Sequence, residues 1–407
     1  MKLIKIFFKI FLNSFKIIYS IIFIFFTYLI SFKKKFYIGF IKTKSLGTFS
    51  TSMEVFKYEC LEKKISLDDY TILWFRSPNI ANKVLFKKYF HDQIVLPSYI
   101  LRPVFDFCNK YNFLKKKFIA PYRSVDKNYN KKIILKKEDI WNHRDIHNVL
   151  IRNKPYIKFT KEEIEIGENF LNSKGVRSQD KFVCFGSRGK NFKGEDVETI
   201  RNGKIKNQIK TMNYLTSKDY KVFRMGRNED QKLECANNKL IIDYAFDDRK
   251  SDLLDLYIFS KCDFLVSGNS GLNTLATLFR KQKLVVDFAG FNEINTENDK
   301  YISLIVPKIY RRTSNNELVK FSEVFEKNLE PIAKVEDIKE LGYFAEHTSE
   351  NEILEATKEF LNSKNLDTSE DYDEQKSFWK LVNEYSPHAG NFKICKSFFN
   401  KYCKIFC

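Results

Sequence analysis

The sequence lacks the short motifs that identify several common enzyme classes. It contains neither G-x-x-x-x-G-K-[ST] nor G-x-G-x-x-G, which counts against a P-loop NTPase and a dinucleotide-dependent oxidoreductase. It has no C-x-x-C pair, several of its 8 cysteines lie in apolar runs such as Phe182–Phe185, and its 5 histidines lack zinc-ligand spacing. These absences favour reduced, buried thiols over a disulfide framework. We therefore expect no structural metal and no cofactor.

Runs of a single charge sign are also scarce. The 407 residues carry a net charge of +19, but the lysines are spread along the chain and there is no Arg-rich tract, so nucleic-acid binding is not predicted. The same charge suits an anionic membrane surface or a phosphorylated substrate. Asp371-Tyr372-Asp373 matches a D-x-D metal-binding motif. Because it lies in an acidic spacer and not at a strand end, we reject it as a metal site.

The first 35 residues differ from the rest of the chain. Ile17–Phe32 is uncharged and almost wholly apolar, with Lys16 before it and Lys33–Lys35 after it. About 16 helical residues reach roughly 24 Å, slightly less than the ~30 Å hydrocarbon core. No A-x-A-like site follows, which disfavours a cleaved signal peptide. The segment 1–35 predicts a membrane-associated protein, through a helix that spans the bilayer or lies in its interface. Its other domains are expected on the cytoplasmic side.

From residue 36 the chain alternates between short apolar runs and amphipathic stretches. In a first domain, 36–165, we expect strands at 36–41, 70–75 and 93–96 and helices at 53–61, 82–90 and 100–111. Thr43–Ser50 contains Gly47 and is expected to be a loop. Residues 125–160 are rich in Lys and Asn and predict a loop or linker before a helix at 161–172.

A second alternating block spans 178–335. The expected strands are at 181–185, 221–224, 240–242, 264–266 and 284–288, and the expected helices are at 205–215, from Asp252 onward, and at 272–280. The tail, 336–407, contains an acidic stretch at 367–374 and predicts helices over 375–406. Strands that alternate with helices indicate parallel sheets. The fold class is therefore α/β, with two Rossmann-like domains, an N-terminal hydrophobic helix and a C-terminal helical tail.

Small residues gather at one strand-to-helix junction, Ser267–Gly271. In open α/β sheets, ligands bind at the carboxyl ends of the strands. Ser270 and Gly271 are expected at a helix N-terminus, where free N–H groups and the helix dipole favour an anion. The alternative is a plain helix cap, because Ser and Asn are the usual capping residues.

Two further loops at strand ends carry arginines. Arg188 follows the strand at 181–185, and Arg224 and Arg227 flank Met225-Gly226 after the next strand. An Arg guanidinium binds phosphate with two parallel hydrogen bonds, although a single Arg is more often part of a surface ion pair. Together with Ser267–Gly271, these loops predict a diphosphate site.

The order of several blocks resembles a bacterial glycosyltransferase family of the GT-B type. The blocks are KFVCFGSRG, IRNGKIKNQI, YKVFRMGR, KLIIDYAFDDRKSDLLDLYIFSKCDFLVSGNSGLNTLATLFRKQ and LIVPK, with IGFIKTKSLGTFSTSMEVFKYE and NKVLFKKYF before them and QKSFWKLVNEY and HAGNFKICKSFF after them. The resemblance covers roughly residues 37–402, excludes the hydrophobic leader, and implies a nucleotide-sugar donor in the second domain. It implies a GT-B-like fold.

The resemblance also implies site residues. Positions that match the family's recurrent residues are Arg188, Arg201, Asn202, Arg224, Gly226, Arg227, Asp252, Ser270 and Gly271. Ser267 and Asn269 belong to the same small-residue loop. One position departs from the pattern, because Gly189 stands where the family usually has an acidic residue.

We therefore predict a metal-independent glycosyltransferase that acts on a cell-envelope glycan or a lipid-linked acceptor. Arginines and a helix N-terminus can stabilise a leaving diphosphate without a metal. A general base is expected in the first domain, near Lys44–Ser50 or at Asp92, and the sequence does not choose between them. The alternatives are another transferase or an epimerase on the same frame, such as a pyruvyl transferase, and a non-catalytic membrane protein that binds carbohydrate or nucleotide.

Overall fold

The computed structural model describes most of the chain, in two compact units. The described residues are 2–30, 35–62, 70–119, 145, 148–189, 198–227, 229, 231–234, 238–291, 302–330, 334–363, 375–385 and 393–406. The units divide between Val149 and Leu150. The D-x-D at Asp371–Asp373, the acidic stretch at 367–374 and most of the expected linker at 125–160 lie outside the described residues.

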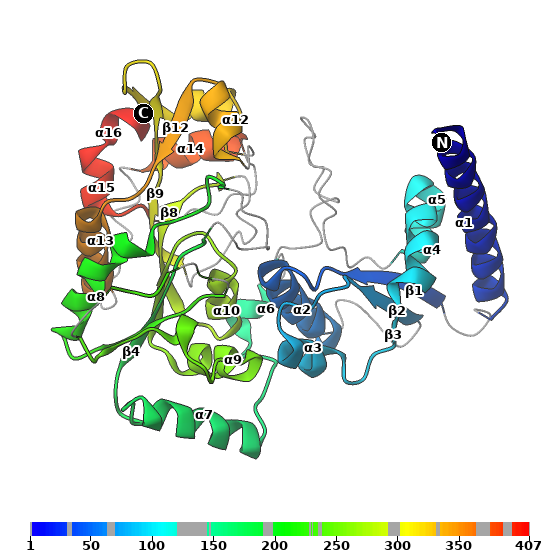
Figure 1. The fold of residues 1–407 in the computed structure, drawn as a ribbon, viewed down its shortest axis with the longest axis horizontal. Coiled ribbons are helices and arrows are strands. Elements are labelled where there is room, and N and C mark those ends of the chain that lie inside the picture. The colour runs from blue at the N-terminus through cyan, green and yellow to red at the C-terminus, as the bar shows by residue number, and fades with distance from the viewer. Residues whose placement is uncertain are drawn as a thin grey trace. The chain divides into compact units, whose positions relative to one another are not determined.

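The first unit holds a parallel sheet of three strands in the order β1-β2-β3. Its elements (Figure 1) are α1 (Lys2–Ile30), β1 (Lys35–Ile41), α2 (Leu46–Leu61), β2 (Tyr70–Arg76), α3 (Lys83–Phe90), β3 (Val95–Leu96), α4 (Ser98–Lys110) and α5 (Asn112–Phe118). The expected loop at Thr43–Ser50 is wrong in its second half, because α2 begins at Leu46. Phe49 is buried there with Met53 and Phe56, and this packing outweighs the small residues that favour a loop.

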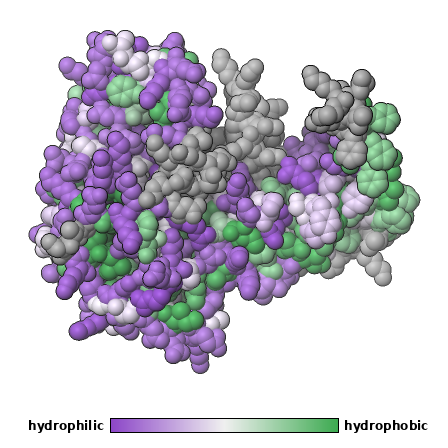
Figure 2. Space-filling model, in the orientation of Figure 1, coloured by the Kyte–Doolittle hydropathy of each residue, from purple (hydrophilic) through white to green (hydrophobic). Residues whose placement is uncertain are grey.

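Helix α1 packs on α4 through one face only. Tyr19, Phe23 and Ile24 lie against the core that Leu101 and Val104 belong to, and the Tyr19 hydroxyl donates to the carbonyl oxygen of Ile100 at 3.1 Å. The other face exposes large apolar side chains (Figure 2), among them Phe11, Phe15, Ile18, Ile22 and Phe26. Within α1, Ile10–Leu29 is long and apolar enough to cross a membrane.

The second unit is built on a parallel sheet of six strands. Its order is β6-β5-β4-β7-β8-β9, from β4 (Phe182–Gly186), β5 (Lys221–Arg224), β6 (Ile241–Ile242), β7 (Phe264–Ser267), β8 (Gln282–Phe288) and β9 (Ile302–Pro307). The helices between them are η2 (Ile205–Gln208), α8 (Ile209–Thr216), η3 (Tyr244–Phe246), α9 (Asp252–Lys261) and α10 (Leu272–Leu278), with α6 (Val149–Arg152) and α7 (Lys161–Ser173) before the sheet. This is the doubly wound order, and the strand order reverses between β4 and β7.

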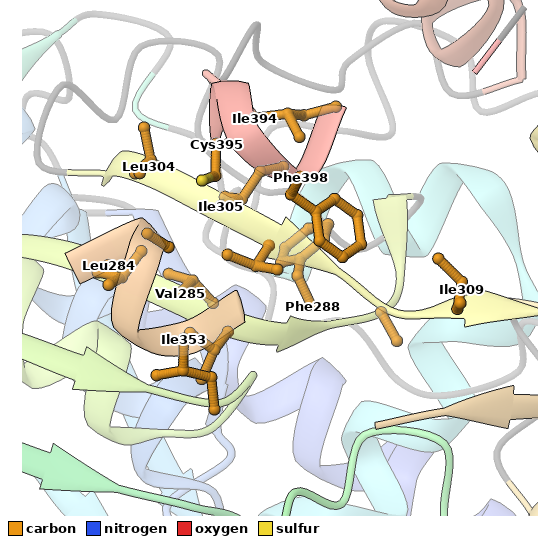
Figure 3. Close-up of a cluster of buried hydrophobic side chains, with 14 of the residues drawn as sticks. Leu284, Val285, Phe288, Leu304, Ile305, Ile309, Ile353, Ile394, Cys395 and Phe398 are labelled. Atoms are coloured by element: carbon orange, nitrogen blue, oxygen red, sulfur yellow. The ribbon is translucent and has the colours of Figure 1, made fainter. Parts of the chain in front are cut away.

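The residues that follow β9 complete this unit. A second, antiparallel sheet joins β11 (Leu318–Val319), β10 (Ile309–Arg312) and β12 (Tyr343–Glu346). The helices after β9 are α11 (Phe321–Glu326), α12 (Val335–Glu340), α13 (Glu350–Ser363), α14 (Lys376–Tyr385), α15 (Lys396–Lys401) and α16 (Cys403–Phe406). Figure 3 shows Ile353 of α13 and Phe398 of α15 gathered with Val285 and Phe288 of β8 and Ile305 of β9. The tail therefore completes the core of the six-stranded sheet.

The predicted fold class, α/β with two Rossmann-like domains as in a GT-B-like fold, is confirmed by the parallel sheet in each unit. The predicted hydrophobic helix and helical tail are present as well. The first domain was placed at 36–165, whereas the compact units divide after Val149. The difference arises because α7 packs against α9 in the second unit.

Candidate functional site

The Ser267–Gly271 loop leaves β7 at the point where the strand order reverses. The backbone N–H of Gly268 donates to the carbonyl oxygen of Gly186, at the end of β4, at 3.2 Å. Ser270 Oγ lies 3.1 Å from Ser267 Oγ and accepts from the N–H of Leu272 at 3.3 Å. Gly271 is the N-cap residue of α10. The loop thus caps a helix, and it stands where a doubly wound sheet binds its ligand.

A turn at Arg201–Gly203 meets this loop. Nη2 of Arg201 lies 3.5 Å from Oδ1 of Asn269. The N–H of Gly203 donates to the carbonyl oxygen of Arg188 at 3.1 Å, so the segment after β4 and the turn lie side by side. Asn202 is buried and accepts at Oδ1 from the Thr199 hydroxyl at 2.7 Å. Arg188, Arg201, Asn202 and the Ser267–Gly271 loop are therefore brought together at the ends of β4 and β7.

The buried polar atoms at this place that make no hydrogen bond within the described part of the chain include Ser187 Oγ and Asn202 Nδ2. Their residues have exposed fractions of 7% and 5%. A buried donor or acceptor that stays unsatisfied costs about 1–3 kcal/mol. A bound polar ligand that satisfied both atoms would recover that free energy.

Arg224 has a different environment, at the end of β5. The guanidinium is buried and held by two carboxylates, with Nη1 3.0 Å from Asp243 Oδ1 and Nη2 2.9 Å from Glu229 Oε2. The carbonyl oxygen of Gln231 accepts a further bond from Nη1 at 3.1 Å. These contacts occupy both terminal nitrogens and make Arg224 a support for the loop after β5. Its role as a ligand of the diphosphate remains a prediction.

The other predicted residues of that loop also lie among carboxylates. Nη2 of Arg227 is 2.5 Å from Asp252 Oδ1 and 3.1 Å from Asp255 Oδ2. These acidic residues lie in the first turn of α9, where a negative charge is favourable. A Cβ atom at Gly226 would lie 2.5 Å from Glu229 Oε1, so a side chain at this position would displace Glu229, a partner of Arg224. The loop after β5 is thus a charge-paired structure one strand away from the point of reversal.

Sequence reasoning missed a buried polar cluster at the ends of β8 and β9. Asp287, Lys308 and His347 meet there: His347 Nδ1 lies 3.4 Å from Asp287 Oδ1 and 3.2 Å from Lys308 Nζ. Asp287 and Lys308 have exposed fractions of 1% and 2%. Each of the apolar runs LVVDFAG and LIVPKIY contains a single charged residue. Because a buried charge requires a partner, these two residues could have predicted the cluster.

In the first unit, Asp92, one of the two predicted locations of a general base, is not at the carboxyl end of a strand. It lies between α3 and β3, before the first residue of β3, whereas ligands of open sheets bind at the carboxyl ends. Burial raises the pKa of Asp92, but the charge and the hydrogen bond of Lys57 outweigh burial and lower it. A lowered pKa makes a carboxylate a weaker base. Lys44–Ser50 follows the carboxyl end of β1, and a general base in this stretch stays a prediction.

No protein-family model matches the chain, and no curated protein is significantly similar to it. Solved structures with similar folds include a family 9 glycosyl transferase from Veillonella parvula, with 13% identity, a TM-score of 0.44 and coverage of 81% of this chain and 97% of that one. The ADP-heptose LPS heptosyltransferase II of E. coli has 11% identity and a TM-score of 0.39, and the alignment covers 61% and 84% of the two chains.

A third similar structure is S. aureus MnaA with UDP. It has 12% identity and a TM-score of 0.35, and the alignment covers 88% of this chain and 93% of that one. Such low identities and TM-scores assign no family to the chain, so the function is inferred from its own residues.

Proposed function

We propose that the protein is a glycosyltransferase that moves a sugar from a nucleotide-sugar donor to a cell-envelope glycan or a lipid-linked acceptor. The second unit, 150–407, would bind the donor, and the first unit would bind the acceptor. The donor diphosphate would lie at the ends of β4 and β7, near Ser270 and Gly271. Arg188 and Arg201 would neutralise it.

The observation that carries this proposal is the position of the Ser267–Gly271 loop in the sheet. It leaves β7 beside the end of β4, and these two strands flank the reversal of strand order, where doubly wound sheets bind nucleotides. Arg201 contacts Asn269 of the same loop. The orphaned Ser187 Oγ and Asn202 Nδ2 are available to the hydroxyl or phosphate oxygens of a nucleotide sugar.

These residues suggest how the reaction is accelerated. Negative charge develops on the diphosphate as the bond to the sugar breaks, and groups already oriented toward that charge stabilise the transition state. The guanidinium groups of Arg188 and Arg201, next to the Ser267–Gly271 loop, would supply this stabilisation. We therefore propose a reaction that needs no metal ion.

Turnover with a panel of nucleotide sugars tests the activity. The expected result is release of a nucleoside diphosphate from one donor in the presence of membrane lipids or envelope glycans as acceptors. Binding without release from any donor would instead support the carbohydrate- or nucleotide-binding protein. Formation of a different product from the same donor, without transfer, would support an epimerase.

Calorimetry with ADP, UDP and GDP tests the site. We expect Arg188→Ala, Arg201→Ala and Gly271→Val each to weaken binding at least tenfold, the factor that about 1.4 kcal/mol of lost interaction represents. Arg177→Ala is the matched control, because Arg177 is an exposed arginine just before β4, at the opposite end of the strand. Unchanged affinity in the three site variants would show that the diphosphate binds elsewhere.

We further propose that α1 attaches the protein to an anionic membrane by lying in the interface. If Ile10–Leu29 crossed the bilayer, α4, which packs on Tyr19, would enter the hydrocarbon with it. The outward side of α4 carries an ion pair between Arg102 and Asp106 at 2.9 Å, and charges at that depth are costly. A helix in the interface keeps α4 in water, while the exposed apolar face of α1 enters the membrane.

Sedimentation with liposomes tests this attachment. Phe15→Glu with Ile22→Glu is expected to abolish binding to liposomes that contain anionic lipid, because both side chains are on the exposed face. Because both side chains are largely exposed, the melting temperature should be unchanged. The matched control is a pair of exposed apolar residues elsewhere, Ile164→Glu with Ile166→Glu. Liposome binding by the α1 variant at the parent level would refute attachment through this face.

A further inference from the structure

We propose that Lys308 is a positioning residue of the donor site. Its ammonium group ties the Arg201–Gly203 turn to the ends of β8 and β9, and so holds the Arg201 guanidinium at Asn269. This inference rests on the proposed donor site, and it assigns a task to a buried lysine that no predicted function uses.

The geometry around Lys308 links three separate parts of the second unit. Lys308 follows β9 directly, and its backbone N–H donates to the carbonyl oxygen of Phe288 at the end of β8 at 2.9 Å. Its Nζ donates to the carbonyl oxygen of Asn202 at 2.7 Å. The third contact is with His347 Nδ1, at 3.2 Å. One ammonium group therefore joins the turn, the central sheet and the segment that precedes α13.

Asp287 provides a second support for the turn. It has a left-handed backbone, with φ of 48°, which is uncommon for a residue other than glycine. Thr348 holds it there, because the N–H of Thr348 donates to Asp287 Oδ1 at 2.8 Å and the N–H of Asp287 donates to Thr348 Oγ1 at 3.1 Å. A Cβ atom on Gly203 would lie 2.9 Å from Asp287 Oδ2. The turn is thus packed against Asp287 and hydrogen-bonded to Lys308.

The position of Arg201 depends on this turn. Asn202 is the neighbour of Arg201, and its carbonyl oxygen is the acceptor for Lys308. Loss of that bond frees the Asn202–Gly203 peptide, one residue beyond Arg201. The contact of the Arg201 side chain with Asn269 is already long, at 3.5 Å. The expected consequence is a displaced guanidinium and weaker binding of a diphosphate, without any contact between Lys308 and the ligand.

The charge on Lys308 gives this role a pH dependence. Burial lowers the pKa of Lys308, while the negative charges of Asp287 and Glu198 raise it and Lys204 lowers it further, for a value of about 8. His347 faces the same ammonium group and can accept its bond only at an unprotonated Nδ1. Between pH 7 and pH 9 the ammonium group becomes a neutral amine, a weaker donor to Asn202.

Binding of ADP and UDP to the full chain across pH 7 to 9 tests the proposal. The parent protein is expected to lose affinity for these ligands several-fold over this range. The last phosphate ionisation of the ligand, with a pKa of about 6, is nearly complete at pH 7 and does not account for such a loss. Lys308→Met is expected to bind about tenfold more weakly at pH 7, the loss typical of a charged hydrogen bond, and to show no further change up to pH 9. Lys393→Met is the matched control, because Lys393 is also a buried lysine and lies in the segment that pairs with the middle of β9, at Ile305.

The outcomes separate this inference from the proposed function. Failure of the parent protein to bind any nucleoside diphosphate refutes the donor site and this inference with it. Binding by Lys308→Met with the affinity and pH profile of the parent refutes the inference alone. If Lys308→Met does not fold, as judged by circular dichroism, the profile of the parent decides, because an affinity that is constant from pH 7 to 9 overturns the proposal.

Discussion

Replacement of Gly203 with alanine is expected to destabilise the second unit and to weaken donor binding. The added methyl group would lie 2.6 Å from Ser187 Oγ and 2.9 Å from Asp287 Oδ2, both well inside an ordinary contact distance. Ser187 Oγ makes no hydrogen bond within the described residues, so it can rotate away at little cost. Asp287 is held by both of its bonds to Thr348, so the strain falls on the turn or on Asp287.

The size of the effect follows from this crowding. Inserting a methyl group into a packed interior typically costs about 1–3 kcal/mol. For a unit of this size, each kcal/mol lowers the melting temperature by about 2–4 °C, so a decrease of several degrees is expected. If the turn relieves the strain by moving, Arg201 moves with it, and the affinity for ADP or UDP decreases as well.

Thermal unfolding followed by circular dichroism, together with calorimetry, measures both effects. Gly268→Ala is the matched control for stability, because its Cβ would meet only the carbonyl oxygen of Val286, at an ordinary 3.8 Å. We expect that variant to melt within about 1 °C of the parent, since a substitution without a clash rarely exceeds ±0.5 kcal/mol. Parent-like melting and parent-like binding by Gly203→Ala would refute the packing argument for the turn.

Three further predictions concern charged groups. Arg224→Met is expected to lower the free energy of unfolding in urea by about 3–5 kcal/mol, because it leaves two partly buried carboxylates without their cation. The Arg227 side chain is 46% exposed, so Arg227→Met should cost no more than about 1 kcal/mol. Equal costs would contradict this distinction. Burial, with two acidic neighbours, raises the pKa of Glu59 to about 7. The contribution of Glu59 to stability is therefore complete below its usual pKa and is lost as pH rises to about 7. Glu59→Gln should become more stable relative to the parent between pH 5 and pH 7.5, and a constant difference in unfolding free energy would refute this. Lys308 should give stability the opposite pH dependence, because above pH 8 the unfolded chain retains a proton that the folded chain releases. In urea unfolding, the stability of the parent relative to Lys308→Met should therefore increase from pH 8 to 9.5. A decrease would contradict the lowered pKa.

Much of the fold could be predicted from local pattern. The strands at 36–41, 70–75, 181–185, 221–224 and 264–266 were each predicted to within a residue or two of β1, β2, β4, β5 and β7, because an apolar run bounded by polar residues marks a buried strand. The start of α2 could not be predicted in this way. Gly47 and the serines beside it favour a loop, and only the burial of Phe49 in the first unit makes that stretch helical.

In the candidate site, too, local features could be predicted from the sequence, whereas contacts between distant residues could not. The sequence predicted that Arg188 and Ser267–Gly271 follow strands, which is a local property. The partners of Arg224 could not be predicted, because Asp243 is 19 residues away and meets Arg224 only when β5 pairs with β6. Asp287 and Thr348, 61 residues apart, were missed for the same reason.

The amino-acid sequence by itself determined that this protein alternates strands and helices, that an apolar segment begins the chain, and that small residues occupy the junction at Ser267–Gly271. These are consequences of residue spacing and backbone preference, which act over a few residues. Only the tertiary structure decided that β7 pairs with β4 where the strand order reverses, that Arg224 is neutralised, and that Lys308 supports the Arg201–Gly203 turn. Strand order and burial of charge depend on contacts between distant segments, and those contacts exist only in the folded chain.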